Sequence, residues 1–197
     1  MNKFPISFFL SAFILGSTGA VTQGAEVKVL RNLPYAETEN PRQTLDLAIP
    51  SQSAPETGRP LVIWIHGGGW KNGNKGSGHR PDRLPSLVQT GRFAGATIAY
   101  RLSGEAKWPA QIHDCKAAIR WLRGNARKYG IDPNRIAVWG SSAGGHLVSM
   151  LGSSGGVVEL EGKLGNHLGQ SSRVSAVVNY FGPSALLKMD DFPSKMI

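Results

Sequence analysis

A serine framed by glycines comes directly after a short apolar run, and this arrangement constrains the fold of the chain more than any other feature. The pattern G-S-S-A-G spans residues 140–144, after the apolar run 135–139 and before the helical pattern of residues 145–151. A nucleophilic serine has to be held on a tight turn between a strand and a helix, where glycines keep side chains from crowding it. The sequence therefore predicts Ser142 as a nucleophile at the positive amino end of a helix, with Gly140 and Gly144 giving the clearance that the turn needs.

A second glycine motif, H-G-G-G, occupies residues 66–69 and follows the continuous apolar run 60–65. Such a run is typical of a strand buried on both faces of a parallel sheet. Successive glycines allow the backbone to turn its N–H groups toward a point near the serine. We expect Gly68, Gly69 and Ala143 to be the donors of an oxyanion hole, with His66 and Gly67 as supporting residues of the motif.

The alternation of apolar runs and helical patterns predicts a mostly parallel sheet with helices on both faces. In the long segment 110–129, apolar residues recur at three- and four-residue spacing, and Gly130 follows as a terminator. The expected strands lie near residues 27–31, 44–49, 61–66, 95–100, 135–140 and 175–181, and the expected helices near 81–90, 110–129 and 145–152. The last strand is expected to lie at an unprotected sheet edge.

At this point the chain resembles a known group of proteins. Its motifs are W-I-H-G-G-G-W at 64–70, A-Y-R-L-S at 99–103, W-P-A-Q-I-H-D at 108–114, Y-G-I-D-P at 129–133 and V-W-G-S-S-A-G-G-H at 138–146. Together they are similar to the successive blocks of secreted bacterial esterases and lipases of the α/β-hydrolase superfamily, in particular the branch of feruloyl- and acetyl-esterase-like proteins related to hormone-sensitive lipase. The resemblance covers about residues 27–183. It implies the α/β-hydrolase fold, Ser142 as nucleophile, and a catalytic acid and histidine from the last two strands of the sheet.

The chain has no counterpart for that catalytic acid and histidine. The histidines after Ser142 are His146 and His167, and the acids are Glu159, Glu161, Asp190 and Asp191. We expect His146 to be a packed or capping residue of the helix and His167 to lie beneath the sheet, about 15 Å or more from the serine. An acid without its histidine cannot activate the serine hydroxyl. The chain is therefore expected to hold the first two-thirds of the catalytic domain, in residues 25–197, and to be inactive alone.

The first 24 residues are typical of a signal peptide. Lys3 is followed by the apolar segment 6–15 and then by small residues, and the apolar segment is too short for a spanning helix. We expect cleavage between Ala20 and Ala25 and a secreted or periplasmic protein, with a retained anchor as the alternative. The single cysteine, Cys115, lies in the apolar stripe of the long helix and is expected to be a buried, inert thiol. No pattern predicts a metal site or a cofactor.

The chain carries a net charge of +9. Many of its cations fall into two stretches, Lys71, Lys75, Arg80, Arg83 and Arg92 after the glycine loop, and Lys116, Arg120, Arg123, Arg127 and Lys128 along the long helix. One interpretation is attraction to an acidic polymer such as a uronate-bearing polysaccharide. The favoured interpretation is a mobile loop and the solvated face of a helix. No motif predicts binding to nucleic acid.

The sequence thus predicts a serine carboxylic-ester hydrolase that acts on small-molecule or polysaccharide esters, with short-chain, acetyl or feruloyl acyl groups favoured by the resemblance. Neither a nucleic acid nor an integral membrane protein is expected as a partner. The oligomeric state is open. Two alternatives also stay open: an amidase or peptidase with the same triad, and a non-catalytic binding protein that keeps the hydrolase fold.

Overall fold

The computed structural model describes residues 24–191, and within them six strands form one sheet. The strands are β1 (Val27–Pro34), β2 (Thr44–Pro50), β3 (Arg59–Ile65), β4 (Ala94–Ile98), β5 (Ile131–Ser141) and β6 (Ala176–Tyr180). Their order in the sheet is β1-β2-β4-β3-β5-β6. Strand β2 pairs antiparallel with β1 and β4, whereas the pairs β4-β3, β3-β5 and β5-β6 are parallel. The mostly parallel sheet of the prediction is therefore confirmed.

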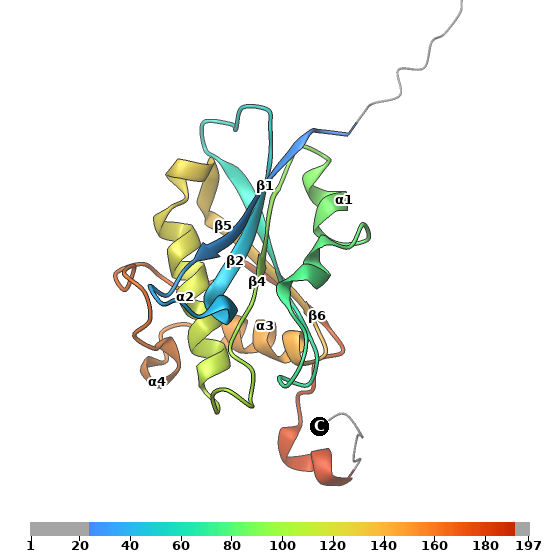
Figure 1. Cartoon of the computed structure of the whole chain (residues 1–197), viewed down its shortest axis with the longest axis vertical. Coiled ribbons are helices and arrows are strands. Elements are labelled where there is room, and N and C mark those ends of the chain that lie inside the picture. Colours follow the sequence, from blue (N-terminus) through green and yellow to red (C-terminus); the bar gives the residue numbers. More distant parts are fainter. Residues whose placement is uncertain (1–23, 192–197) are drawn as a thin grey trace, which may run out of the picture.

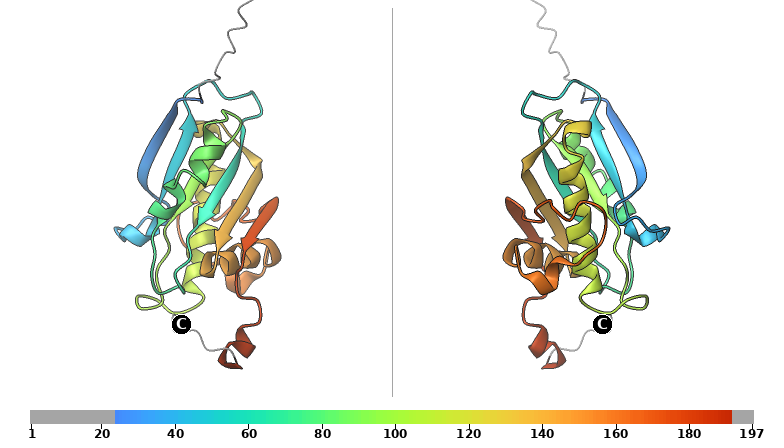
Figure 2. Two further views of the ribbon diagram at one scale, coloured as in Figure 1. Left: turned by 90° about the vertical axis from the view of Figure 1, so that its right-hand side faces the viewer. Right: turned by 90° about the vertical axis from the view of Figure 1, so that its left-hand side faces the viewer.

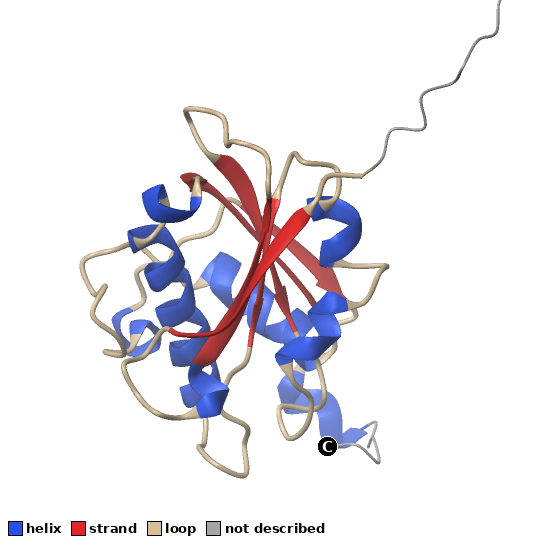
Figure 3. Ribbon diagram, turned by 45° about the horizontal axis from the view of Figure 1, so that its top comes forward, coloured by secondary structure: helices blue, strands red, loops and turns tan. Residues whose placement is uncertain are grey.

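Helices cover both faces of this sheet, as expected for parallel strands joined by crossovers. Helix α1 (Leu84–Val88) lies on one side, and helix α2 (Ala110–Gly124) lies on the other (Figure 1). Helix α3 (Ala143–Ser153) packs against β5, β6 and α2, and the short helix α4 (Val158–Glu161) packs against α2. Figure 3 shows the strongly twisted sheet between these helices.

The core fills the space between the sheet and helices α2 and α3. Strand β3 lies between β4 and β5, and its residues Leu61, Ile63 and Ile65 are fully buried. On α2, Ile112, Ile119 and other apolar residues of the predicted stripe are also fully buried. These contacts fix the carboxyl ends of β3 and β5 side by side, which is where both glycine motifs begin.

Two predicted helices differ from the structure in length. Helix α2 ends at Gly124 rather than near residue 129, because glycine is a weak helix former and the backbone and side-chain N–H groups of Asn125 both donate to the carbonyl of Trp121. A 3-10 turn, η3 (Arg127–Tyr129), follows, and Gly130 ends that turn with a φ of 63°. Helix α1 spans five residues rather than ten, because the N–H of Arg83 closes a turn onto the carbonyl of Arg80 before the helix and Gln89 caps its end.

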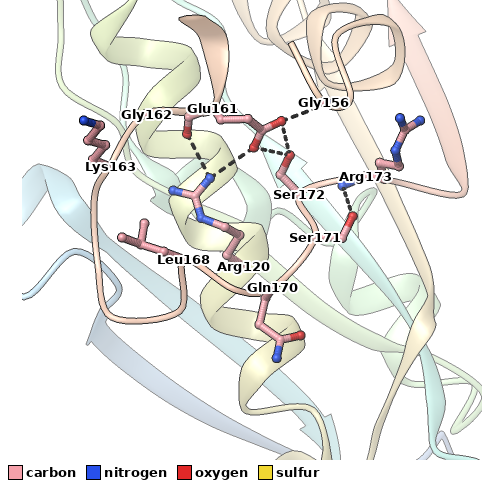
Figure 4. Close-up of a pocket in the computed structure, with 10 residues that line it drawn as sticks. All are labelled: Arg120, Gly156, Glu161, Gly162, Lys163, Leu168, Gln170, Ser171, Ser172 and Arg173. Atoms are coloured by element: carbon pink, nitrogen blue, oxygen red, sulfur yellow. Dashed lines mark hydrogen bonds and ion pairs between the residues drawn. The ribbon is translucent and has the colours of Figure 1, made fainter. Parts of the chain in front are cut away.

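The second cationic stretch was expected to be the solvated face of a helix, and this is wrong for Lys116 and Arg120; Arg123 is half-buried as well and donates to the carbonyls of Pro133 and Arg173. Lys116 and Arg120 on α2 are 0% and 3% exposed, and both pair with Glu161, which lies 2.8 Å from Lys116 Nζ and 3.2 Å from Arg120 Nη1. Figure 4 shows the Glu161 carboxylate between Arg120 and the hydroxyl of Ser172. These charges hold the segment after α3 against α2, and only Arg127 and Lys128 of this stretch are exposed as expected.

Cys115 is buried in the core, as the sequence predicts. Burial is the main cause that raises the pKa of its thiol well above the ordinary value, and the nearby carboxylate of Asp114 raises it further. The thiolate is the reactive form of cysteine, so this residue is chemically inert.

Candidate active site

The predicted nucleophile lies at the junction of β5 and α3. Strand β5 ends at Ser141, helix α3 begins at Ala143, and Ser142 between them has φ 55° and ψ −123°. This is an unfavourable conformation for a residue with a side chain, and such strain is found where a structure holds a functional residue in a fixed direction. The N–H of Ser142 donates to the carbonyl of Tyr180 at 2.9 Å, which anchors the turn to the end of β6.

The glycines around Ser142 stand where a side chain would not fit. A Cβ at Gly140 would collide with the carbonyl of Gly144, and a Cβ at Gly144 would collide with the carbonyl of Ile65. Both contacts are with backbone atoms, which cannot move aside as a flexible side chain can. The clearance expected from the sequence is therefore present in the structure.

The H-G-G-G loop reaches the same place from the neighbouring strand. In the register of the parallel pair β3-β5, Ile65 lies opposite Gly140, so the loop after β3 and the turn after β5 leave the sheet together. A Cβ at Gly67 would lie 3.1 Å from Cβ of Ser142. The structure thus brings the two motifs into direct contact, although residues 70–139 lie between them in the sequence.

The loop then turns sharply, with a φ of 113° at Gly68 and of 58° at Gly69. The carbonyl of Gly68 accepts hydrogen bonds from the N–H groups of Lys71 and Asn72, at 3.1 and 2.8 Å. Among residues 24–191, the N–H groups of Gly68 and Gly69 donate to no other backbone or side-chain atom. The loop, Ser141 and Ser142 border one cavity of about 420 Å³.

His66 holds the start of the loop. Its ring stacks on Tyr100 with centroids 4.3 Å apart, its Nδ1 lies 2.8 Å from the carbonyl oxygen of Gly67, and the Tyr100 hydroxyl donates to the His66 carbonyl at 2.9 Å. Burial lowers the pKa of His66 to about 4, outweighing the hydrogen bond to Gly67, which raises it. The ring is therefore neutral near pH 7, and it acts as a fixed support.

Neither histidine after Ser142 is placed as its base. The ring of His146 packs edge-on against Trp70 and Trp108, with centroids 5.2 and 5.7 Å away, as expected for a packed residue. His167 contacts Gly124 and Asn125 at the carboxyl end of α2. That end leads into the start of β5, whereas Ser142 follows the end of β5, so His167 lies toward the other end of this strand from Ser142.

The two acids after Ser142 whose side chains the structure describes, Glu159 and Glu161, are not placed as partners of a catalytic histidine either. Glu161 is held by Lys116 and Arg120, and Glu159 is exposed. Asp190 and Asp191 belong to the 3-10 turn η4 (Leu186–Asp191), and their side chains lie outside the part that the structure describes. Within residues 24–191, no group of three described histidine, cysteine or acidic side chains is close enough to hold a metal ion.

The structure adds two features that sequence reasoning missed. Trp70, Trp108 and His146 line an apolar cavity of about 460 Å³ beside the first turn of α3. In the cavity at Ser142, the guanidinium of Arg83 lies over the ring of Trp64, with Cζ 4.0 Å from the centroid. The residues of the apolar cavity lie far apart in the sequence, and so do Arg83 and Trp64. Neither feature therefore produces a local sequence pattern.

Solved structures of esterases share this architecture. A truncated form of a carbohydrate esterase from gut microbiota superposes with a TM-score of 0.77 at 36% identity, over 86% of this chain and 61% of that one. A bifunctional GH43-CE protein of Bacteroides eggerthii gives a TM-score of 0.75 at 38% identity, over 83% of this chain and 22% of that one. The fold is therefore that of the α/β-hydrolase esterases.

Sequence comparison gives the family. The chain belongs to the BD-FAE family, whose model matches residues 45–196. Among curated proteins, the chain is similar to Esterase LipC of Mycobacterium tuberculosis, with 34% identity over 145 residues, 73% of this chain and 34% of that protein. The chain thus spans about a third of the length of this relative.

Proposed function

We propose that the site is the nucleophile and oxyanion half of a carboxylic-ester hydrolase, with Ser142 as the nucleophile. The observation that carries this proposal is the contact between the glycine loop and the strained serine turn around one cavity. A serine hydroxyl and free backbone N–H groups on one side of a cavity are what acyl transfer requires. The named relatives support the reaction class, since they are esterases.

In the proposed reaction, Ser142 Oγ attacks the ester carbonyl and forms a tetrahedral intermediate. The N–H groups of Gly68, Gly69 and Ala143 hold the negative oxygen, and each such donor typically contributes about 2.7–4 kcal/mol to the stabilisation of the transition state. The intermediate collapses to an acyl-enzyme as the alcohol leaves, and water then releases the acid. Ala143 suits this role because its N–H is at the first turn of α3, where the helix dipole favours negative charge.

The proton of Ser142 needs a base that the described residues do not place beside it. We propose that a histidine and an acid complete the triad from a longer protein, of which residues 25–197 are the first two-thirds of the catalytic domain. The shares of LipC and of the carbohydrate esterase that the chain covers support this proposal. Without the base, the serine is a weak nucleophile, and the chain alone is inactive or nearly so.

For the substrate, we propose short-chain, acetyl or feruloyl esters, including esters on polysaccharides. The apolar cavity between Trp70, Trp108 and His146 supports this proposal, because aromatic walls suit an acyl group or the face of a sugar ring. The similarity to a carbohydrate esterase from gut microbiota supports it as well. Nothing in the site favours an amidase, a peptidase or a binding protein over an ester hydrolase.

We also propose that residues 1–24 are a signal peptide and that the protein is secreted or periplasmic. Residues 1–23 lie outside the described part of the chain. The N–H of Ala25 already donates to the carbonyl of Gln89 at 2.8 Å, which supports a boundary just before this residue. Among the described helices, none has the length and apolar character needed to cross a membrane.

The test of the function uses the enzyme with its triad complete and p-nitrophenyl acetate as substrate. Ser142→Ala should abolish turnover and leave the circular dichroism spectrum and melting temperature close to those of the parent. The matched control is Ser149→Ala on the same helix, which should keep most of the activity. Substantial turnover by Ser142→Ala would show that Ser142 is not the nucleophile.

A further inference from the structure

Arg83 is the charged side chain in the cavity at Ser142, and the fold holds it there on two sides. Its guanidinium lies over the ring of Trp64, which is itself buried, and its Nη1 donates to the carbonyl of Ser77 at 2.6 Å. Trp64 is held in turn by a hydrogen bond from its Nε1 to Ser77 Oγ at 2.9 Å. Arg83 and Ser142 border the same cavity. The cation therefore has a fixed position relative to the reacting serine.

The guanidinium of Arg83 forms no direct ion pair with a described residue, and the carboxylate of the adjacent Asp82 pairs with Arg80 instead. No described carboxylate lies within ion-pair distance of it, and none of the described residues that line the cavity is an aspartate or a glutamate. By contrast, Lys75 of the same stretch is engaged by Asp46 at 3.5 Å. Burial lowers the pKa of Arg83, but an arginine stays charged at neutral pH.

Part of the guanidinium also remains available to a ligand. Nη1 is used by the Ser77 carbonyl, whereas Nε and Nη2 donate to none of the described residues and are not sealed from solvent. If Arg83 only held residues 77–83 against Trp64, the face of its guanidinium and one N–H would be enough. The remaining N–H groups form the fork that binds a carboxylate through two hydrogen bonds.

We propose that Arg83 selects ester substrates that carry a carboxylate, such as esters of uronic-acid sugars, by pairing with that carboxylate while the ester carbonyl lies at Ser142. This inference rests on the proposed function of the site and adds the chemical class of its substrate. It also divides the two cationic stretches of the sequence. The first stretch, which includes Arg83, places a cation at the site. In the second stretch, Lys116 and Arg120 form ion pairs with Glu161.

The experiment measures binding, so that it does not depend on turnover. In the Ser142→Ala chain, the dissociation constants of methyl galacturonoside and methyl galactoside are measured by NMR titration at low salt. We expect the uronate to bind about tenfold more tightly, the effect of one charge-assisted pair. Added salt should weaken binding of the uronate and leave that of the neutral sugar unchanged.

Arg83→Gln should remove the preference, and Arg83→Lys should keep part of it because the charge remains. The matched control is Arg92→Gln, since Arg92 also lies over an aromatic ring, that of Phe93 at 5.9 Å, but does not border the cavity. The melting temperature of each variant shows that it is folded. Equal affinities for the two sugars in the parent, or a preference that survives Arg83→Gln, would overturn the inference and leave the esterase proposal intact. The esterase proposal would instead be contradicted by turnover of the Ser142→Ala variant of the complete enzyme.

Discussion

The backbone of Gly67 passes so close to Ser141 that a Cβ on the glycine would lie 2.6 Å from the serine's carbonyl oxygen. No side chain can be added there without separating the loop from the turn that carries Ser142. The close approach of the glycine loop to Ser142 therefore depends on the absence of a side chain at Gly67. Catalysis by an oxyanion hole depends on such distances to a few tenths of an ångström.

The first prediction tests the loop. Gly68→Val should lower kcat of the complete enzyme by about 10²-fold or more, because a Cβ at this position meets the carbonyl of Asn72 and the φ of 113° is unfavourable for valine. Gly104→Val is the control, since nothing lies within 4 Å of a Cβ at Gly104. Steady-state kinetics with p-nitrophenyl acetate distinguish the outcomes: a change confined to KM would mean that the loop only binds substrate.

The second prediction concerns the strain at Ser142. Ser142→Gly should raise the free energy of unfolding by about 1 kcal/mol, because the strain of about 1–3 kcal/mol is relieved and the added flexibility of glycine offsets part of it. The measurement is urea unfolding. Ser86→Gly, in the exposed part of α1, should instead lower stability by about 0.5 kcal/mol. Equal effects of the two substitutions would mean that the turn stores no strain.

Much of this site could be predicted from the sequence, because its parts are local. The strand, the serine and the helix after it are consecutive, and so are the β3 run and residues 66–69. All six strands and the start of α3 followed from apolar runs and helical spacing. The contact between the two motifs also follows, once two parallel strands are expected to be neighbours.

The features that the sequence did not predict depend on partners far along the chain. Lys116 and Arg120 form a polar pattern on α2 that is typical of a solvated face, and only the fold reveals that Glu161, more than 40 residues later, covers them. The stacking of Arg83 on Trp64 likewise needs β3 and the segment before α1 to be in place. Local periodicity contains no information on either contact.

The third prediction follows from that buried charge cluster. Glu161→Gln should destabilise the fold by about 3–5 kcal/mol, because Lys116 and Arg120 would be left buried without their anion. Glu159→Gln is the matched control two residues away, and this exposed residue should change stability by less than about 0.5 kcal/mol. Chemical unfolding measures both. A small effect at Glu161 would mean that the two cations regain water when the pair is broken.

The fourth prediction concerns pH. The pKa of His66 is about 4 in the folded chain and 6.5 in its ordinary state, so between these values the unfolded state binds the proton and the folded state does not. Stability therefore falls as pH falls from 6.5 toward 4, by on the order of 3 kcal/mol from this residue. His66→Gln should make urea midpoints at pH 7 and 4.5 differ less than in the parent. An unchanged difference would place the acid sensitivity in other residues.

The last prediction concerns β6, which lies at the sheet edge opposite β1 (Figure 2). Its side chains are exposed along the whole strand, and an exposed apolar edge strand readily pairs with another chain. Residues 25–197 should therefore associate with rising concentration, as measured by light scattering. They should also hydrolyse p-nitrophenyl acetate only weakly, because no described base lies beside Ser142. Val178→Lys, in the middle of β6, should reduce the association. Val158→Lys should not, since Val158 is 80% exposed but lies on α4, away from the edge. The prediction would be contradicted if residues 25–197 stayed monomeric and hydrolysed the ester rapidly, and if His146→Ala or His167→Ala abolished that activity. The catalytic base would then be one of these two histidines.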